Sequence, residues 1–414
     1  MSSLLKINNF FLVLIIILIS FSSVALSQNS QITVIKRNNY TDTNYWWLDN
    51  NNFGRTNSNL ELNGNFQFDH LNSTYKINFF SEIDNENNLK SIYLNESFIK
   101  YKFSDKSFIR LGRYYRDFSS YLNDKLSSGS MLISHNAQAM PKIGFVSSKK
   151  IQNNINFNYG ISHGVFDKNE TYDKAPFLHE KFIYINIKKN KYKMSFGFVH
   201  NAMWSGSIVG EGRQPSTLND FLRILIAADE KVTENTVIFP HVNALGNHLG
   251  IWDFFVSRND NEKILNFYYQ HFFEDTSGLR FRNEFDGLWG LEIKNYLPNT
   301  NFLIEYLDTT NTYEDSYYKH SIYTLGWNYK NYSIGNPFVS STSNNPKKVL
   351  HVGVSGNFLS NYYQTILSRK INNHDSIKYK IIFGRNVNKS KIEIIFANNN
   401  KNKSNIGLSL SRYF

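Results

Sequence analysis

The feature that most restricts the fold of this chain is a repeated unit of alternating residues followed by a short polar turn. In residues 192–198, Tyr, Met, Phe and Phe occupy every second position, and Lys, Ser and Gly stand between them. Residues 377–384 and 392–397 follow the same alternation. Side chains on a β-strand point alternately to its two faces, so each unit predicts a strand with one apolar face. From residue 58 onward we therefore expect an all-β fold.

An apolar face can be covered by lipid, on the outside of a membrane barrel, or by the second sheet of a soluble sandwich. The end of the chain favours the barrel. Apolar residues alternate from Ile406 to a terminal Phe414, which resembles the terminal signal of bacterial outer-membrane barrels, although Arg412 departs from it. The sequence also contains only 7 Pro with which to protect sheet edges, and a closed barrel has no edges.

Connection lengths also favour a transmembrane antiparallel β-barrel. Outer-membrane barrels have short periplasmic turns and longer extracellular loops. Candidate strands number roughly 20, including segments that begin at Ile32, Tyr317 and Tyr332, and we expect about 18 barrel strands, with 16 to 20 allowed. The long connections, which we expect at the extracellular end, are residues 116–140, 164–180, 204–247 and 274–284.

The barrel interpretation predicts which side chains face lipid. Phe196 and Ile381 should face lipid, while Ser195 and Lys380 should face the lumen. The longest connection also carries a helical pattern, because Leu and Phe recur at helical spacing after a Pro-Ser-Thr start, over residues 216–231. A helix there could cover or plug the mouth of the barrel; a surface hairpin is the alternative.

The N-terminus has the pattern of a secretory signal peptide. Lys6 precedes an apolar core at residues 10–21, and Ala25, Leu26 and Ser27 supply a small-residue cleavage site. The core is shorter than the roughly 20 residues that a spanning helix needs. We therefore expect residues 1–27 to be removed and residues 28–414 to form a single barrel in the bacterial outer membrane.

Composition and motifs argue against several other functions. The chain has no Cys, and its net charge of +11 is spread singly along strands and turns, so we expect no nucleic-acid partner. Ser134, His135 and Asn136 contain nucleophile and base residue types, but neighbours on a strand point to opposite faces. We therefore expect no catalytic residues here.

Other polar residues have the types found in metal sites and in glycoside hydrolases. His241, His248 and Asp253 match no familiar metal-ligand spacing. Glu274 and Asp275, with Asp286 further on, could supply the two carboxylates of a glycoside hydrolase, although acidic loop residues more often hold turns. We expect no enzyme activity, no metal and no cofactor.

Aromatic residues near strand ends offer a candidate sugar-binding surface. Most should form the aromatic girdles of a membrane barrel. Pyranose rings, however, also pack on aromatic side chains while carboxylates and guanidinium groups bond their hydroxyls. We predict that Trp204 and Trp289 stack on saccharide, and that Asp275, Arg280 and Asp286 bond its hydroxyls or carboxylates.

Several runs in matching order resemble the Wzi capsule-assembly family of surface lectins. The first reads Leu-Ile-Ser-His-Asn-Ala at residues 132–137, and another reads Ile-Gly-Asn-Pro-Phe at residues 334–338. Further runs of this kind cover residues 178–184, 197–204, 244–254, 269–279, 286–291 and 302–309.

The resemblance implies an outer-membrane barrel that binds and retains capsular polysaccharide or exopolysaccharide at the cell surface without catalysis. It also implies a helical segment before or within the barrel, whereas no helical pattern precedes residue 58 here. Beside the polysaccharide, we expect outer-membrane lipid, lipopolysaccharide and the barrel-assembly machinery as partners. The alternative function is a general porin or solute channel with a basic, anion-preferring lumen.

Overall fold

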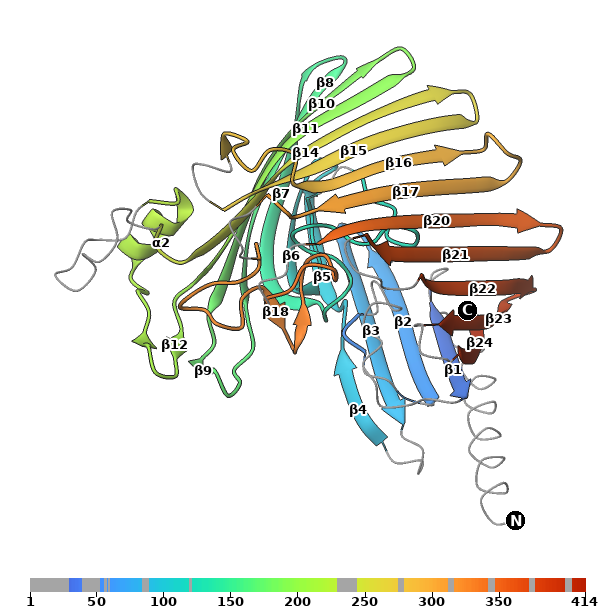
Figure 1. The fold of residues 1–414 in the computed structure, drawn as a ribbon, viewed down its shortest axis with the longest axis horizontal. Coiled ribbons are helices and arrows are strands. Elements are labelled where there is room, and N and C mark those ends of the chain that lie inside the picture. Colours follow the sequence, from blue (N-terminus) through green and yellow to red (C-terminus); the bar gives the residue numbers. More distant parts are fainter. Residues whose placement is uncertain are drawn as a thin grey trace.

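In the computed structural model, nineteen strands form one antiparallel sheet that closes into a barrel (Figure 1). The predicted signal peptide, residues 1–27, lies outside the residues that the structure describes. The described residues are 30–38, 53–55, 58, 60–83, 89–118, 121–228, 244–274, 279–311, 316–341, 347–371, 377–398 and 404–414.

The barrel wall is built from strands that follow one another around the sheet. Its first half contains β1 (Gln31–Asn38), β2 (Leu60–His70), β3 (Ser73–Ile83), β4 (Leu89–Leu94), β5 (Phe98–Ser104), β6 (Ser107–Tyr114), β7 (Met140–Gln152), β8 (Ile155–Val165), β10 (Phe177–Lys189) and β11 (Tyr192–Trp204). Its second half contains β14 (Asn247–Asp260), β15 (Lys263–Phe273), β16 (Gly287–Lys294), β17 (Thr300–Asp308), β20 (Lys348–Phe358), β21 (Asn361–Lys370), β22 (Lys378–Val387), β23 (Ser390–Asn398) and β24 (Ser404–Tyr413).

The wall has 18 strand positions, which confirms the predicted number. β4 and β5 both pair with β3, at its two ends, and together fill one position. The barrel closes where β1 pairs with β2 on one side and with β24 on the other. The strand predicted at Ile32 is therefore present. The barrel strands predicted at Tyr317 and Tyr332 were wrong, because both residues lie in the connection between β17 and β20.

The two faces of the wall follow the predicted alternation. Phe196 has 43% of its surface exposed on the outer face of β11, while Ser195 is completely buried toward the lumen. On β22, Ile381 pairs with Phe396, whose side chain is 37% exposed, and Lys380 pairs with Ala397 on the opposite face. The outer surface is therefore apolar where lipid would contact it.

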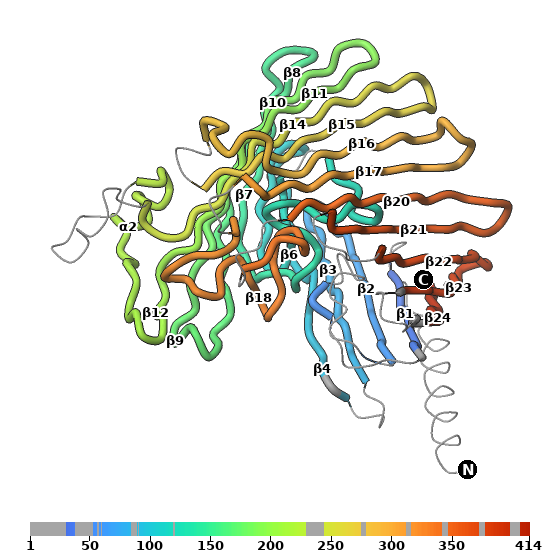
Figure 2. The backbone as a smooth tube through the Cα atoms, in the orientation of Figure 1, coloured from blue at the N-terminus to red at the C-terminus, as the bar shows by residue number. Residues whose placement is uncertain are grey.

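Short turns lie at one end of the barrel, and the long connections lie at the other (Figure 1 and Figure 2). Asn190, Asn261 and Asn388 occupy three of the tight turns with φ between 51° and 60°, a left-handed conformation that Asn tolerates well. The C-terminus shares this end, since the Phe414 amide donates to the Ser30 carbonyl at 3.0 Å.

One short helix and several short strands lie at the end of the barrel that carries the long connections. The predicted helix is present as α2 (Leu218–Leu225), where Thr217 and Asp220 form a capping box. Among the described residues, no helix is long and apolar enough to span a membrane. The remaining elements are the short strands β9 (Tyr172–Lys174), β12 (Ser207–Ile208), β13 (Gly212–Arg213), β18 (Asn328–Tyr329) and β19 (Tyr332–Ser333).

α2 neither enters nor plugs the lumen. Its Ile224 packs with Ala202, Trp204 and Leu245 in a small hydrophobic cluster. Ala202 and Trp204 have the same parity on β11 as the lipid-facing Phe196, so this cluster continues the outer face of the wall beyond the lipid-facing part. The helix therefore covers the outside of the barrel rim.

Candidate functional site

The lumen is filled by two connections, which we call the plug. The first plug segment, residues 121–139 with the preceding 115–118, joins β6 to β7, and the second, residues 316–341, lies between β17 and β20. Residues 116–140 form a long connection at the end opposite the short turns, as predicted, but this connection folds into the lumen. The largest plug side chains that are almost completely buried are Leu126, Met131, Leu132, Tyr318, Tyr323, Trp327 and Tyr329.

The two plug segments are interlocked by backbone and side-chain hydrogen bonds. The Trp327 indole donates to the Leu132 carbonyl at 3.0 Å. The Ser134 amide donates to the Ile334 carbonyl at 2.7 Å, and its hydroxyl donates to the Gly335 carbonyl at 2.6 Å. Because each contact joins one segment to the other, the plug is a single packed unit rather than two separate loops.

Polar groups on the lumen face of the wall hold the plug in place. Glu305 on β17 accepts hydrogen bonds of 2.6 Å from the Ser127 hydroxyl and from the Ser128 amide. Glu292 on β16 accepts a 2.6 Å bond from the Asn123 side chain. Hydrogen bonds to charged groups are stronger than those between neutral groups. These buried carboxylates therefore fasten the first plug segment to the wall.

Neutral groups on neighbouring strands add further attachments. The Gln270 side chain on β15 accepts a 3.0 Å hydrogen bond from the Met131 amide. His351 on β20 has its Nε2 2.6 Å from the Leu126 carbonyl oxygen and its Nδ1 2.7 Å from the Ser368 hydroxyl. In the tautomer with the proton on Nε2, His351 donates to Leu126 and accepts from Ser368. Because β15, β16, β17 and β20 are consecutive in the wall, the first plug segment is anchored across a broad sector of it.

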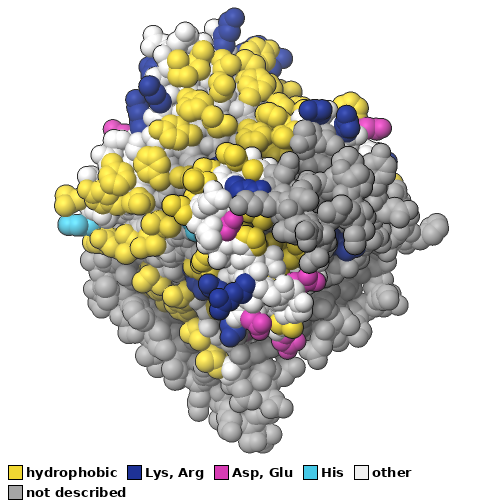
Figure 3. Space-filling model, turned by 90° about the vertical axis from the view of Figure 1, so that its left-hand side faces the viewer, with side chains coloured by type: hydrophobic (Ala, Val, Ile, Leu, Met, Phe, Trp, Pro, Cys, Tyr) yellow, Lys and Arg dark blue, Asp and Glu magenta, His cyan; other side chains and the backbone are white. Residues whose placement is uncertain are grey.

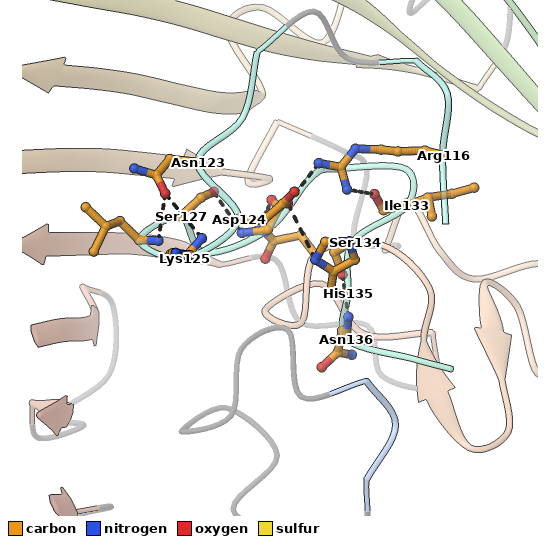
Figure 4. Close-up of polar contacts among 12 residues, drawn as sticks. Arg116, Asn123, Asp124, Lys125, Ser127, Ile133, Ser134, His135 and Asn136 are labelled. Atoms are coloured by element: carbon orange, nitrogen blue, oxygen red, sulfur yellow. Dashed lines mark hydrogen bonds and ion pairs between the residues drawn. The ribbon is translucent and has the colours of Figure 1, made fainter. Parts of the chain in front are cut away.

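The Ser134–His135–Asn136 run lies in the plug, where its side chains have structural partners (Figure 4). Asp124 accepts a 2.8 Å bond from Arg116, and the His135 ring lies 3.9 Å from the same carboxylate. Burial lowers the pKa of His135 to about 4, with Asp124 opposing this shift, so the imidazole is neutral near pH 7. Ser134 donates its hydroxyl to Gly335 rather than to His135. This arrangement therefore lacks the nucleophile–base hydrogen bond of a hydrolase.

Trp204 ends β11, and its side chain is only 6% exposed. Its ring packs with Phe177, Phe221 and His163 at centroid distances of 5.4–5.6 Å. Its indole Nε1 has no hydrogen-bond partner among the described residues. A buried donor without a partner is rare in proteins, so this group is a candidate for bonding a ligand or water.

Trp289 lies in a different environment, on the outer face of β16. Its ring stacks on Tyr269 with centroids 3.8 Å apart, and its indole donates to the Phe285 carbonyl at 3.2 Å. The neighbouring Phe267 and Phe285 are 42% and 69% exposed. Aromatic clusters on the outer face are typical of the membrane-interface girdle, which was the alternative interpretation of these residues.

Among the charged residues predicted to bind saccharide, Asp286 already has partners within the protein. Asp286 is completely buried, and its carboxylate accepts hydrogen bonds from Asn311 and from the Tyr317 hydroxyl at 2.8 Å. It therefore ties the β15–β16 connection to the connection that leads into the second plug segment. Arg280 is exposed in the β15–β16 connection. Asp275 lies outside the described residues.

A pocket, which we call the rim pocket, lies beside Trp204 at the end with the long connections. It has an empty volume of about 450 Å³, open solvent at its mouth included. Besides Trp204, its lining includes Gln214, Gly246, His320 and Tyr323. Sequence reasoning missed the last four residues because they come from separate connections and carry no shared motif. In the rim pocket, the predicted site residue Trp204 lies beside the polar residues Gln214, His320 and Tyr323.

Burial lowers the pKa of His320 to about 4, with the neighbouring His248 also lowering it. His320 is therefore neutral near pH 7, and its Nδ1 accepts hydrogen bonds from the Ile322 and Tyr323 amides at 3.2 Å. The rim pocket thus presents neutral polar groups and an aromatic edge. Within the described part of the chain, no group of three or more His, Asp or Glu is arranged to hold a metal ion.

These features define a closed transmembrane β-barrel whose lumen is filled by its own connections. The family of capsule assembly protein Wzi matches residues 27–381, which is most of the chain. The chain therefore belongs to the Wzi capsule-assembly family. Two of the runs that carried this resemblance, residues 132–137 and 334–338, lie in the two plug segments and contact each other there.

Among solved structures, the chain is similar to Wzi of Escherichia coli, an outer membrane protein described as involved in group 1 capsule assembly and as a carbohydrate-binding β-barrel. Identity is 14%, the TM-score is 0.63, and the similarity covers 94% of this chain and 85% of that chain. The chain is also similar to a triple mutant of the Rhodopseudomonas blastica porin, at 8% identity and a TM-score of 0.40, over 93% of this chain and 98% of that chain. At these identities the likeness concerns the fold alone. No curated protein sequence matches the chain.

Proposed function

We propose that this protein binds capsular polysaccharide or exopolysaccharide and retains it at the surface of the bacterial outer membrane. Family membership supports a role in capsule assembly. The barrel would stand with its short turns in the periplasm and its long connections outside, as in other outer-membrane barrels. In this orientation the rim pocket and α2 face the medium. Residues 1–27 would be removed as a signal peptide.

The observation that carries this proposal is the plug. The interlocked segments fill the lumen and are fastened by Glu292 and Glu305 to its wall. A general porin needs an aqueous path through its lumen. The filled lumen argues against the porin alternative and favours a fixed outer surface on which a polymer can bind.

The rim pocket has the chemistry that saccharide binding requires. Trp204 lines the pocket and has a buried indole donor without a partner among the described residues, and Gln214 offers an amide that can both donate and accept. A sugar ring has apolar C–H faces, which pack on aromatic side chains, and hydroxyl groups, which bond amides. On the face of the molecule that Figure 3 draws, Lys and Arg side chains lie near Asp and Glu side chains. Arg280, exposed in the β15–β16 connection, remains a predicted contact, and so does Asp275.

Binding without catalysis is part of the proposal. The outward apolar face would contact membrane lipid and lipopolysaccharide, and the barrel-assembly machinery would insert the chain through its C-terminal strand. The carbohydrate binding described for Wzi of Escherichia coli supports a polysaccharide partner here as well.

The proposal is tested by measuring polysaccharide that is cell-bound and polysaccharide that is released into the medium. Deleting the protein should release the layer. Trp204→Ala and Gln214→Ala should release part of it at unchanged barrel abundance, since losing one desolvated aromatic contact costs on the order of 2 kcal/mol. Trp289→Ala is the matched control, because its ring stacks on Tyr269 and does not line the rim pocket.

Gln214→Ala keeps the test informative if Trp204→Ala lowers the amount of folded barrel. Retention of the layer in the deletion strain would refute the proposed function. Retention in both rim variants, at normal abundance, would instead show that the protein binds its polymer elsewhere.

A further inference from the structure

A second cavity occupies the lumen between the plug and the short turns, and we call it the basal cavity. Its empty volume is about 1040 Å³, open solvent included. Asp117 and Phe118 of the first plug segment border it together with the walls of β5, β6, β7, β8 and β10. The exposed turn residues Asp105 and Lys106 also line it, so the cavity opens at the short-turn end. Ligand pockets are commonly 300–1,000 Å³, so it is large enough for a small molecule or a chain end.

The basal cavity has an excess of positive charge. Lys100 and Lys102 occupy alternate positions of β5 and face the lumen. Their strand neighbours Ile99 and Tyr101 are exposed on the outer face. Among the described residues, no acidic side chain forms a salt bridge with Lys100, Lys102 or the turn residue Lys106, which also lines the cavity.

The nearby acidic groups cancel only part of this charge. Asp117 is paired with Arg110 at 3.0 Å. Asp69, on β2, accepts hydrogen bonds from the neutral Gln67 and Thr74 and interacts electrostatically with Lys100 and Lys102, so it offsets part of their charge. Asp105 is the other acidic residue in the described lining, and it lies at the exposed turn. In a cavity with low-dielectric walls, such an excess of lysine attracts anions.

Aromatic rings stand beside these lysines. The Lys100 ammonium lies 4.0 Å from the centroid of the Phe108 ring. Phe118 and Phe182 line the same space, with centroids 6.4 Å apart. Asn158, also in the lining, accepts a 2.7 Å hydrogen bond from Ser148 and so presents its amide group at a fixed position. The cavity therefore combines cationic, aromatic and amide groups.

We propose that the basal cavity is a second binding site, open to the periplasm, for a carboxylate-bearing oligosaccharide. The uronate carboxylates bond Lys100 and Lys102, and the apolar face of a sugar ring packs on Phe108 and Phe182. Asn158 bonds a ring hydroxyl. A purely anionic ligand, such as phosphate, uses the lysines but gains nothing from the aromatic rings, and a neutral sugar lacks the charges that the lysines attract. This site goes beyond the proposed function, since it lies across the plug from the rim pocket.

The test is calorimetric titration of the full detergent-solubilised protein with trigalacturonate. Lys100→Gln with Lys102→Gln should weaken binding by roughly tenfold or more, because charge-assisted hydrogen bonds are lost. The matched control is Lys189→Gln with Lys263→Gln, which removes two charges from exposed strand ends beside the short turns and should leave affinity unchanged. Gln214→Ala should also leave affinity unchanged, which separates this site from the rim pocket.

Comparison ligands complete the experiment. Maltotriose, inorganic phosphate and hexaglutamate should each bind at least tenfold more weakly than trigalacturonate. Equal binding of phosphate or hexaglutamate would show a general anion site, and equal binding of maltotriose would show that charge is irrelevant; each would overturn the proposal. So would an unchanged affinity in the Lys100→Gln, Lys102→Gln protein, or the absence of binding by the wild type. If the rim variants lose polysaccharide retention but still bind trigalacturonate, the basal cavity binds its ligand independently of the rim pocket.

Discussion

Ser127 and Glu305, 178 positions apart in the sequence, meet inside the lumen, where the Ser127 hydroxyl donates a 2.6 Å hydrogen bond to the Glu305 carboxylate. The Ser128 amide and the Tyr268 hydroxyl donate to the same carboxylate. Glu305 is 1% exposed, so all three donors are removed from bulk water. One buried side chain of β17 thus joins the plug to its own strand and to Tyr268 on β15, which lies two strands away in the wall.

Glu305→Ala should loosen the plug. Hydrogen bonds to charged groups contribute about 1.5–3 kcal/mol each, and buried donors left without a partner add a further cost. We expect ion-conducting steps in planar bilayers for this variant and a closed wild type. Glu262→Ala, on an exposed turn, is the control and should stay closed. A closed Glu305→Ala barrel would mean that apolar packing alone holds the plug.

Arginine at lipid-facing positions should destabilise the barrel. Ile381→Arg should cost about 2–4 kcal/mol if the residue lies near the bilayer midplane, whereas Lys380→Arg keeps a luminal charge and should cost much less. Urea unfolding in lipid vesicles measures both. Equal costs would contradict the register of β22. Ser195 is not a useful partner for the Phe196→Arg variant, because its site is completely buried and arginine there would overpack the lumen.

Removal of Phe414 should reduce barrel assembly. Its backbone amide bonds the Ser30 carbonyl at 3.0 Å, next to the seam where β1 pairs with β24. The expected result is less heat-modifiable, folded protein in outer membranes, as seen by electrophoresis without boiling. Phe414→Tyr keeps an aromatic terminus and should assemble normally. Full assembly without residue 414 would argue against the predicted role of the terminal signal.

Asp286 should make stability depend on pH. Burial raises its pKa to about 6, against about 3.9 in an unfolded chain. The folded state therefore binds this proton more tightly, and the stability from the protonated form is present below about pH 4 and lost as pH rises through about 6. Asp286→Asn should show a smaller fall in Tm between about pH 5 and about pH 8 than the wild type. An identical fall in both would mean that other groups cause it.

Much of the barrel could be predicted from local patterns. The alternation in residues 192–198 predicted the facing of Ser195 and Phe196, because strand geometry has period 2 and lipid requires apolar side chains. The Pro-Ser-Thr start and the helical spacing of Leu and Phe predicted α2, which begins at Leu218 directly after Thr217. The strand predictions at Tyr317 and Tyr332 failed, because apolar residues buried in a plug show alternation that resembles a lipid-facing strand.

The candidate site was less predictable than the wall. Trp204 and Trp289 share a residue type and a place near strand ends, yet Trp204 borders the rim pocket whereas Trp289 stacks on Tyr269 outside it. Asp286, chosen as a sugar contact, instead bonds Asn311 and Tyr317. The roles of these residues depend on which distant chain segments pack against them, and the neighbouring sequence does not predict those contacts.

The sequence by itself determined the wall: its strands, their facing, the closing strand at Phe414 and the family resemblance all rest on neighbouring residues. Only the tertiary structure decided that the lumen is plugged. The contacts that hold the plug join residues far apart in the chain, such as Leu132 and Trp327, which are separated by 195 positions. Such contacts form because a closed wall brings both segments into one confined space, where buried polar groups must find partners.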